Sequence, residues 1–203
     1  MWLSLFAPGR AEGTVDTEAL ALEAKNSGLP LDVSRATALW GGWLRGCEAL
    51  TLMQISGSDI EDAVDSKHAS DLTQAHLIQT LSAIGREWID FYFLRSRRAL
   101  EEFQLSGVLE ALEAARQEGH VRFFGLHCEG RAAASIANWQ LHDAFEVVCI
   151  DGDSEQHEEL ARIAAGRRVG VLKRVGKPGA APIEDNQIAL APVRVAEDVR
   201  RIA

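Results

Sequence analysis

The sequence predicts an α/β protein in which parallel strands close into a compact (β/α)8 TIM barrel. Three observations predict this fold class: eight short apolar runs recur along the chain, a Gly or polar break follows the runs, and segments of helical periodicity lie between them. Strands that alternate with helices indicate a parallel sheet covered by helices, and eight repeats favour a closed barrel over an open sheet. The predicted strands are residues 2–6, 29–33, 49–55, 89–94, 121–126, 145–150, 169–173 and 188–192.

The segments between the strands carry the apolar spacing and the end signals of α-helices. Leu77, Leu81 and Ile84 share one face of the best example. Ser70 is its candidate N-cap, and Gly85 lies just past its last turn. The other predicted helices are residues 16–26, 106–119, 131–143 and 154–165.

The connection between the last two strands has a different composition. In "RVGKPGAAPIEDNQ", residues 174–187, Gly and Pro recur at intervals that do not suit a helix interior. We therefore expect a reduced or missing helix between strands 7 and 8. A barrel of 203 residues is at the small end for this fold.

Composition limits the class of protein and its partners. The length of 203 residues predicts a single domain over residues 1–203, and the formal net charge of −9 argues against nucleic-acid and anionic-membrane partners. No apolar run approaches the roughly 20 residues of a membrane-spanning helix, and no basic segment precedes the apolar start of the chain. The three cysteines are widely spaced and fit neither a disulfide framework nor a zinc site. We therefore expect a cytoplasmic protein without a metal centre.

Polar side chains close several of the predicted strands. Active sites of (β/α)8 barrels lie at the carboxyl ends of the strands, so these residues are candidates for function. His127 is notable because it ends an apolar strand and histidine titrates near neutral pH. The side chains expected to point into one mouth of the barrel are those of Asp32, Arg95, His127, Asp151 and Lys173.

Residues 72–127 contain two motifs in a fixed order, "LIQTLSAIGREWIDFYFLRS" and "GVLEALEAARQEGHVRFFGLH". They resemble the middle of an aldo-keto reductase, where a helix, "L..IDLYLLH", a second helix and "L..GKVRAIGVSN" follow one another. The residues that match this pattern at the same spacing are Asp90, Gly119, Val121, Arg122 and Gly125. The resemblance implies a single aldo-keto reductase-like barrel, a nicotinamide cofactor and a catalytic tetrad of Asp, Tyr, Lys and His.

Only one tetrad position carries the family residue. Asp32 matches the Asp, but Thr37 stands at the Tyr position and Arg95 at the His position. The Lys position falls within residues 54–56, which contain no lysine. The only tyrosine, Tyr92, lies inside the fourth predicted strand. The resemblance therefore implies that the chain lacks the proton donor of the family's carbonyl reduction.

The cofactor positions of the family are changed as well. The Ser-Asn pair after the fifth strand reads His127-Cys128, and the aromatic residue after the seventh strand reads Lys173-Arg174. Arg194 precedes a predicted helix whose N-terminus could hold an anion. If NADP or NAD binds, the residues expected to hold it are Cys128, Asp151, Lys173, Arg174 and Arg194.

Three functions remain open from these residues. The leading hypothesis is a non-catalytic protein that binds a small molecule or a protein partner. The second is an atypical NAD(P)-dependent oxidoreductase for a small carbonyl compound, with candidate catalytic residues Asp32, Arg95 and His127. The third is a non-redox enzyme that uses Asp32, His127 and Asp151. For Arg95 we predict an ion pair with Asp32 that plugs the mouth, and the alternative is a ligand anion.

Other residues have simpler interpretations. Cys128 is expected to be a small buried apolar side chain rather than a nucleophile. Trp40 and Trp43 either form an aromatic wall over the mouth or pack beneath a shortened loop. His76, like the other histidines of the helices and turns, is expected at the surface.

Overall fold

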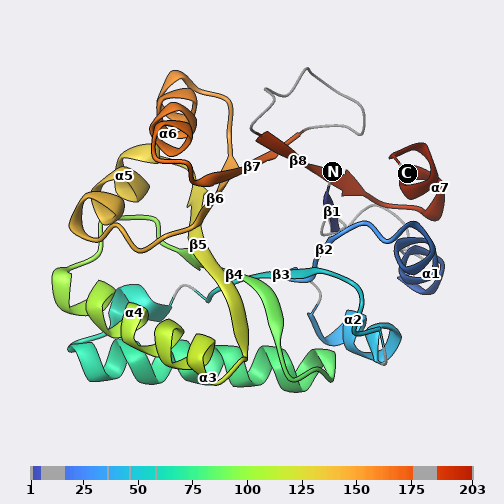
Figure 1. Cartoon of the computed structure of the whole chain (residues 1–203), viewed down its shortest axis with the longest axis horizontal. Helices are drawn as coiled ribbons and strands as arrows, with labels where there is room; N and C mark the ends of the chain where they lie inside the picture. Colours follow the sequence, from blue (N-terminus) through green and yellow to red (C-terminus); the bar gives the residue numbers. More distant parts are fainter. Residues whose placement is uncertain are drawn as a thin grey trace.

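The computed structural model describes residues 2–5, 17–35, 37–45, 47–57, 59–175 and 187–202 (Figure 1). Its eight strands are all parallel and form a closed barrel in chain order, in which β1 pairs with both β2 and β8. The predicted fold class is therefore confirmed. The strands are β1 (Trp2–Leu5), β2 (Leu31–Asp32), β3 (Leu52–Ile55), β4 (Ile89–Arg95), β5 (Val121–Glu129), β6 (Val147–Asp151), β7 (Gly170–Arg174) and β8 (Gln187–Val193).

Helices surround the strands on the outside of the barrel (Figure 1). They are α1 (Thr17–Ser27), α2 (Thr37–Leu44), α3 (Ser66–Ile84), α4 (Glu102–Gln117), α5 (Ala132–Leu141), α6 (Glu155–Gly166) and α7 (Ala196–Ile202), with a 3-10 turn η1 (Asp59–Asp62). The connection between β7 and β8, for which we predict a reduced or missing helix, lies mostly outside the described residues. None of the described helices has the length and apolar character that crossing a membrane requires.

Two helices begin earlier than their sequence predicts. The N-cap of α3 is Asp65, whose carboxylate accepts a hydrogen bond of 2.7 Å from a backbone N–H of the first turn, so the predicted cap Ser70 lies inside the helix. The N-cap of α4 is Glu101 instead of a residue near Ser106, and the Gln104 side chain accepts a hydrogen bond from the Glu101 N–H at 3.1 Å. At α3 the earlier cap residue satisfies one free N–H group of the first turn, and at α4 the Gln104 side chain of the first turn bonds back to the backbone of the cap residue.

The core has an inner and an outer part, because successive side chains of a strand point to opposite faces. The outer part fills the space between strands and helices, and it includes Tyr92, Cys128 and Ile150. The inner part fills the barrel itself. Its buried members are Met53, Phe93, Val147, Cys149, Leu172 and Leu190.

Helix α2 follows the turn after β2 and packs closely on α3. A Cβ atom at Gly41 would lie 1.7 Å from the backbone oxygen of Ala83, so only glycine allows this approach. Trp40 is buried in the outer core, while Trp43 is partly exposed. Trp40 therefore packs in the outer core between strands and helices, which favours the packing interpretation over an aromatic wall.

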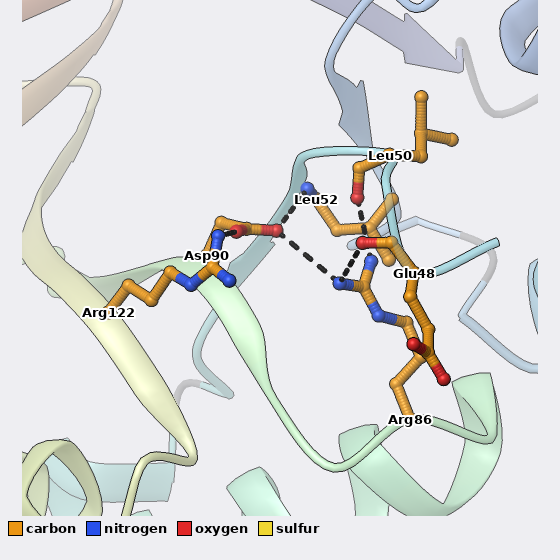
Figure 2. A network of polar contacts seen from close by, with 6 residues as sticks. All are labelled: Glu48, Leu50, Leu52, Arg86, Asp90 and Arg122. Atoms are coloured by element: carbon orange, nitrogen blue, oxygen red, sulfur yellow. Dashed lines mark hydrogen bonds and ion pairs between the residues drawn. The ribbon is translucent and has the colours of Figure 1, made fainter.

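A buried ion network lies at the amino-terminal ends of β3, β4 and β5 (Figure 2). Asp90 accepts a hydrogen bond from the Leu52 N–H at 2.9 Å and forms an ion pair with Arg122 at 2.7 Å. The buried guanidinium of Arg86 lies 3.7 Å from the same carboxylate and donates to the Leu50 carbonyl at 2.7 Å. This network joins three neighbouring strands at the end of the barrel opposite the candidate site.

Candidate functional site

A pocket of about 490 Å³ opens at the carboxyl-terminal ends of the strands, which we call the barrel mouth. The ends of β3 to β7, the turn after β2 and one side chain of α3 line it. The lining contains cations, carboxylates and a buried imidazole. The charged and titratable side chains of the lining are Arg35, Arg95, Arg174, Glu129, Asp151, His127 and His76.

Strand register explains which side chains reach the mouth. Arg95 of β4 pairs with His127 of β5, which pairs with Cys149 of β6. Cys149 belongs to the inner core, so its in-register neighbours Arg95 and His127 also face the barrel axis. One pleat further on, Glu129 pairs with Asp151. Strand β5 runs to Glu129, three residues beyond its predicted end, which adds this carboxylate to the site.

Arg95 forms its ion pair with Glu129, at 2.5 Å between Nη2 and Oε2. The predicted Asp32–Arg95 bridge is therefore wrong. The physical reason is the length of β5: Glu129 lies on the adjacent strand, one pleat above the neighbour of Arg95, and it is the nearer carboxylate.

Asp32 is held from two directions. Its Oδ1 accepts hydrogen bonds from the Ser34 N–H at 2.9 Å and from the Ser34 hydroxyl at 2.6 Å, and Ser34 Oγ in turn accepts from the Ile55 N–H at 2.8 Å. Its Oδ2 lies 3.8 Å from Nη2 of the largely buried Arg174, whose side chain is 9% exposed. The Nε atom of Arg174 lies 3.1 Å from Asp151 Oδ2, so one guanidinium joins two carboxylates. Asp32 thus fixes the turn after β2 and orients Arg174.

His127 is buried, and neither ring nitrogen has a hydrogen-bond partner among the described protein groups. Burial lowers its pKa to about 3, and the positive charges of Arg174, Arg95 and Arg35 act in the same direction. The imidazole is therefore neutral near pH 7. In this form it can donate one hydrogen bond and accept another, but it has no extra proton to give.

The remaining tetrad positions contact each other. The Thr37 hydroxyl is 3.0 Å from the Val33 carbonyl and 3.2 Å from Gln54 Oε1, and Gln54 Nε2 donates to the Ile55 carbonyl at 3.0 Å. Gln54 lies on β3, within the segment that the resemblance gives to the Lys. A threonine hydroxyl hydrogen-bonded to protein oxygens thus replaces the phenol of the family pattern.

Tyr92 cannot take the place of the missing tyrosine from the opposite side of the strand. It is fully buried in the outer core, and its hydroxyl makes a hydrogen bond of 2.7 Å with His76 Nδ1 of α3. Burial raises the pKa of Tyr92, so its proton is held more tightly than in water. His76 is half-buried and lines the pocket, so its predicted surface position is wrong. The reason is that α3 lies over β4 and turns this side chain inward.

Three residues of the predicted cofactor set do not line this pocket. Lys173 forms an ion pair with Glu158 of α6, so the prediction that it points into the mouth is wrong. Cys128 is buried in the outer core, on the helix side of β5. Arg194 is exposed at the start of α7, where its N–H donates to Asp198 Oδ2 at 2.9 Å, and it is not among the described residues that line the pocket.

The structure thus brings Arg95, His127, Asp151 and Arg174 to one pocket and connects Asp32 to it through Arg174. The sequence analysis did not select Arg35 or Glu129. A signal for Glu129 was present, because it lies two residues after His127 and therefore on the same face of an extended strand. Among the described residues, no group of three or more side chains is arranged to hold a metal ion.

Comparison with known proteins shows which solved structures share this fold. No protein-family model and no curated protein sequence matches the chain. Among solved structures, an aldo-keto reductase from Bacillus halodurans in its holo form is similar over 100% of this chain and 84% of its own, with 14% identity and a TM-score of 0.75. An aldo-keto reductase from a Medee basin deep-sea metagenome library matches 99% of this chain and 82% of its own, with 10% identity and a TM-score of 0.74.

A third similar structure is a Bombyx mori aldo-keto reductase solved in complex with NADP. The likeness covers 98% of this chain and 82% of that protein, with 14% identity and a TM-score of 0.70. Identities this low carry information on the fold and not on the activity. The chain therefore has the (β/α)8 barrel fold of the aldo-keto reductases.

Proposed function

We propose that this chain is a divergent aldo-keto reductase-like protein that binds a small ligand at the barrel mouth without reducing carbonyl groups. The observation that carries the proposal is the hydrogen bond between Thr37 and Gln54, which stand where the resemblance expects Tyr and Lys. Arg95, at the expected His position, is engaged by Glu129. A pocket of about 490 Å³ nevertheless remains, which is a typical size for a small-molecule site.

Carbonyl reduction by hydride needs a group that protonates the oxygen. His127 is neutral near pH 7 because its pKa is lowered to about 3. Tyr92 is fully buried and does not line the pocket, and its hydroxyl is bound to His76. The Thr37 hydroxyl is a far weaker acid than a phenol whose pKa a lysine lowers. These residues support the loss of the general acid, which contributes about 10²- to 10⁴-fold to such reactions.

The oxidoreductase alternative requires a nicotinamide cofactor, and the described residues fit it poorly. Cys128 and Lys173 face the helices, and Arg194 lies outside the pocket. Arg174 remains at the mouth, but its guanidinium is held by Asp151 and Asp32. We therefore infer that NADP or NAD does not bind here in the way the resemblance implies.

The non-redox enzyme alternative rests on Asp32, His127 and Asp151. Both carboxylates contact the same guanidinium, that of Arg174, and Asp32 also accepts two hydrogen bonds from Ser34. Both carboxylates are thus engaged by groups of the protein itself, and neither contacts the His127 ring through a hydrogen bond. The binding function is therefore the better supported of the two. A cytoplasmic location, with no nucleic-acid or membrane partner, stays a prediction from the sequence.

The test is a reductase assay with purified protein. We expect no measurable oxidation of NADPH or NADH with a panel of small aldehydes and ketones, while an aldo-keto reductase assayed in parallel is active. Denaturation of the purified protein should release no nicotinamide dinucleotide, and mass spectrometry of the supernatant checks this. Robust turnover, or a stoichiometric amount of released cofactor, would contradict the proposal in favour of an atypical oxidoreductase.

A further inference from the structure

We infer that the pocket at the barrel mouth takes a small carboxylate that carries a carbonyl or hydroxyl oxygen on the adjacent carbon, a 2-oxo or 2-hydroxy acid. This inference rests on the proposed binding function and names its ligand class. It depends on buried groups without a hydrogen-bond partner on two side chains that line the pocket, Arg95 and His127, and on the neighbouring charge of Arg174.

The first argument is the set of buried polar atoms at the mouth that make no hydrogen bond to the described part of the chain: Arg95 Nε, Arg174 Nε, both ring nitrogens of His127 and one acceptor, Glu129 Oε2. Arg95 contacts Glu129 through Nη2, and its buried Nε–H has no hydrogen-bond acceptor among the described groups. Arg174 Nε lies 3.1 Å from Asp151 Oδ2 as an ion pair, but the alignment is not that of a hydrogen bond. A buried donor without an acceptor is unfavourable, so the Arg95 Nε–H and the His127 ring are the groups that favour a ligand with acceptor oxygens.

The second argument is the shape of these donors. A guanidinium presents its N–H groups as a planar fork, which matches the two oxygens of a carboxylate. Arg35 adds a third positive charge at the pocket lining, and all three arginines act on the His127 ring. A carboxylate near this ring would meet a positive potential.

The third argument places the second oxygen of the ligand. Arg95 and His127 are direct neighbours in the register of β4 and β5, and neighbouring strands lie about 4.8 Å apart. Both side chains line the same pocket, so we expect a carboxylate bound by Arg95 to have its adjacent carbon on the side of the imidazole. Neutral His127 has one donor and one acceptor nitrogen, both unpartnered, so it can bind a carbonyl as donor or a hydroxyl as donor and acceptor.

The internal carboxylates limit the charge of the ligand. Glu129 and Asp151 line the same pocket and already contact the two arginines, so a ligand carboxylate competes with Glu129 for Arg95. This competition favours an acid with one negative charge over a dianion. It also makes a sharp prediction, since removal of the Glu129 charge should strengthen binding.

The test is isothermal titration calorimetry of the full chain with pyruvate, lactate, acetate and the uncharged analogue lactamide. We expect pyruvate or lactate to bind, acetate to bind more weakly and lactamide not to bind. Arg95→Gln should weaken binding by about ten-fold or more, and Glu129→Gln should strengthen it. Arg95→Lys keeps the charge but loses the fork, and it should also bind weakly.

Lys173→Gln is the matched control, because it removes one positive charge from β7 on the side facing α6. We expect its affinity to equal that of the original protein, and circular dichroism should show that every variant is folded. Binding of lactamide as tight as that of lactate, an equal loss in Lys173→Gln, or no binding of either acid would overturn the inference. These outcomes leave the reductase assay unaffected, so the two proposals fail separately.

Discussion

Replacement of Asp90 by alanine should destabilise the barrel by several kcal/mol, and the contacts of its carboxylate allow the size to be derived. Asp90 is 3% exposed and faces Arg86, whose side chain is 2% exposed, at 3.7 Å. Removal of one partner of a buried ion pair leaves an uncompensated charge and costs about 3–5 kcal/mol. The Leu52 N–H also loses an acceptor at 2.9 Å (Figure 2).

The expected value is near the lower end of this range for two reasons. Arg86 keeps its hydrogen bonds to the carbonyls of Leu50, at 2.7 Å, and Glu48, at 3.2 Å. The second ion pair of Asp90, with Arg122, involves a side chain that is 58% exposed and contributes at most about 1 kcal/mol. We therefore expect a loss of about 3 kcal/mol for Asp90→Ala.

The measurement is equilibrium unfolding in urea followed by tryptophan fluorescence. Asp90→Asn keeps an acceptor for the Leu52 N–H and should cost less than Asp90→Ala. The control Arg122→Gln should change the free energy of unfolding by less than about 1 kcal/mol. A loss below about 1 kcal/mol in Asp90→Ala would refute the reasoning, because it would mean that the network does not compensate the Arg86 charge.

Two further predictions concern the helix contact and the buried histidine. Gly41→Ala should destabilise the protein by about 1–3 kcal/mol, because its Cβ would lie 1.7 Å from a backbone oxygen of α3. Gly42→Ala, whose Cβ would have no atom within 4 Å, should stabilise it by about 0.5–1 kcal/mol. Thermal unfolding of the two variants measures both effects. The pKa of His127 is lowered to about 3 in the folded chain from an ordinary 6.5, so the unfolded state binds more protons between these values and stability falls as the pH falls through this window. From pH 7 to pH 5 this costs about 2 kcal/mol, and urea unfolding of His127→Gln should show a pH dependence smaller by that amount; an equal dependence would refute the assignment.

Local pattern was sufficient to predict the barrel because each strand of this fold is a short apolar run between polar breaks. The same pattern could not settle which strand-end residues face the axis. A shift of one residue along a strand exchanges its two faces, and the sequence analysis therefore placed Lys173 at the mouth where the structure has Arg174. Only the register shows that Arg174 pairs with the inner-core Leu190, while Lys173 reaches Glu158 of α6.

Long-range contacts account for the other differences. The ends of α3 and α4 depend on caps that compete with similar residues a few positions away, and the sequence does not rank them. The partner of Arg95 depends on how far β5 extends beyond its apolar segment. The apolar pattern stops before Glu129, so it does not predict that β5 extends to this residue. The position of His76 depends on the packing of α3 over β4, which no local pattern encodes.

Residues at the two ends of this barrel have different roles. In (β/α)8 barrels the amino-terminal end of the strands serves stability and the carboxyl-terminal end serves chemistry. Asp90 and Arg122, two of the residues that match the aldo-keto reductase pattern, lie in the ion network at the amino-terminal end. At the mouth, by contrast, Arg95 stands at the expected His position and pairs with Glu129. Because the resemblance is strongest where it reports on stability, it is good evidence for the fold and weak evidence for the reaction, and the ligand has to be inferred from the arginines, carboxylates and imidazole of the mouth itself.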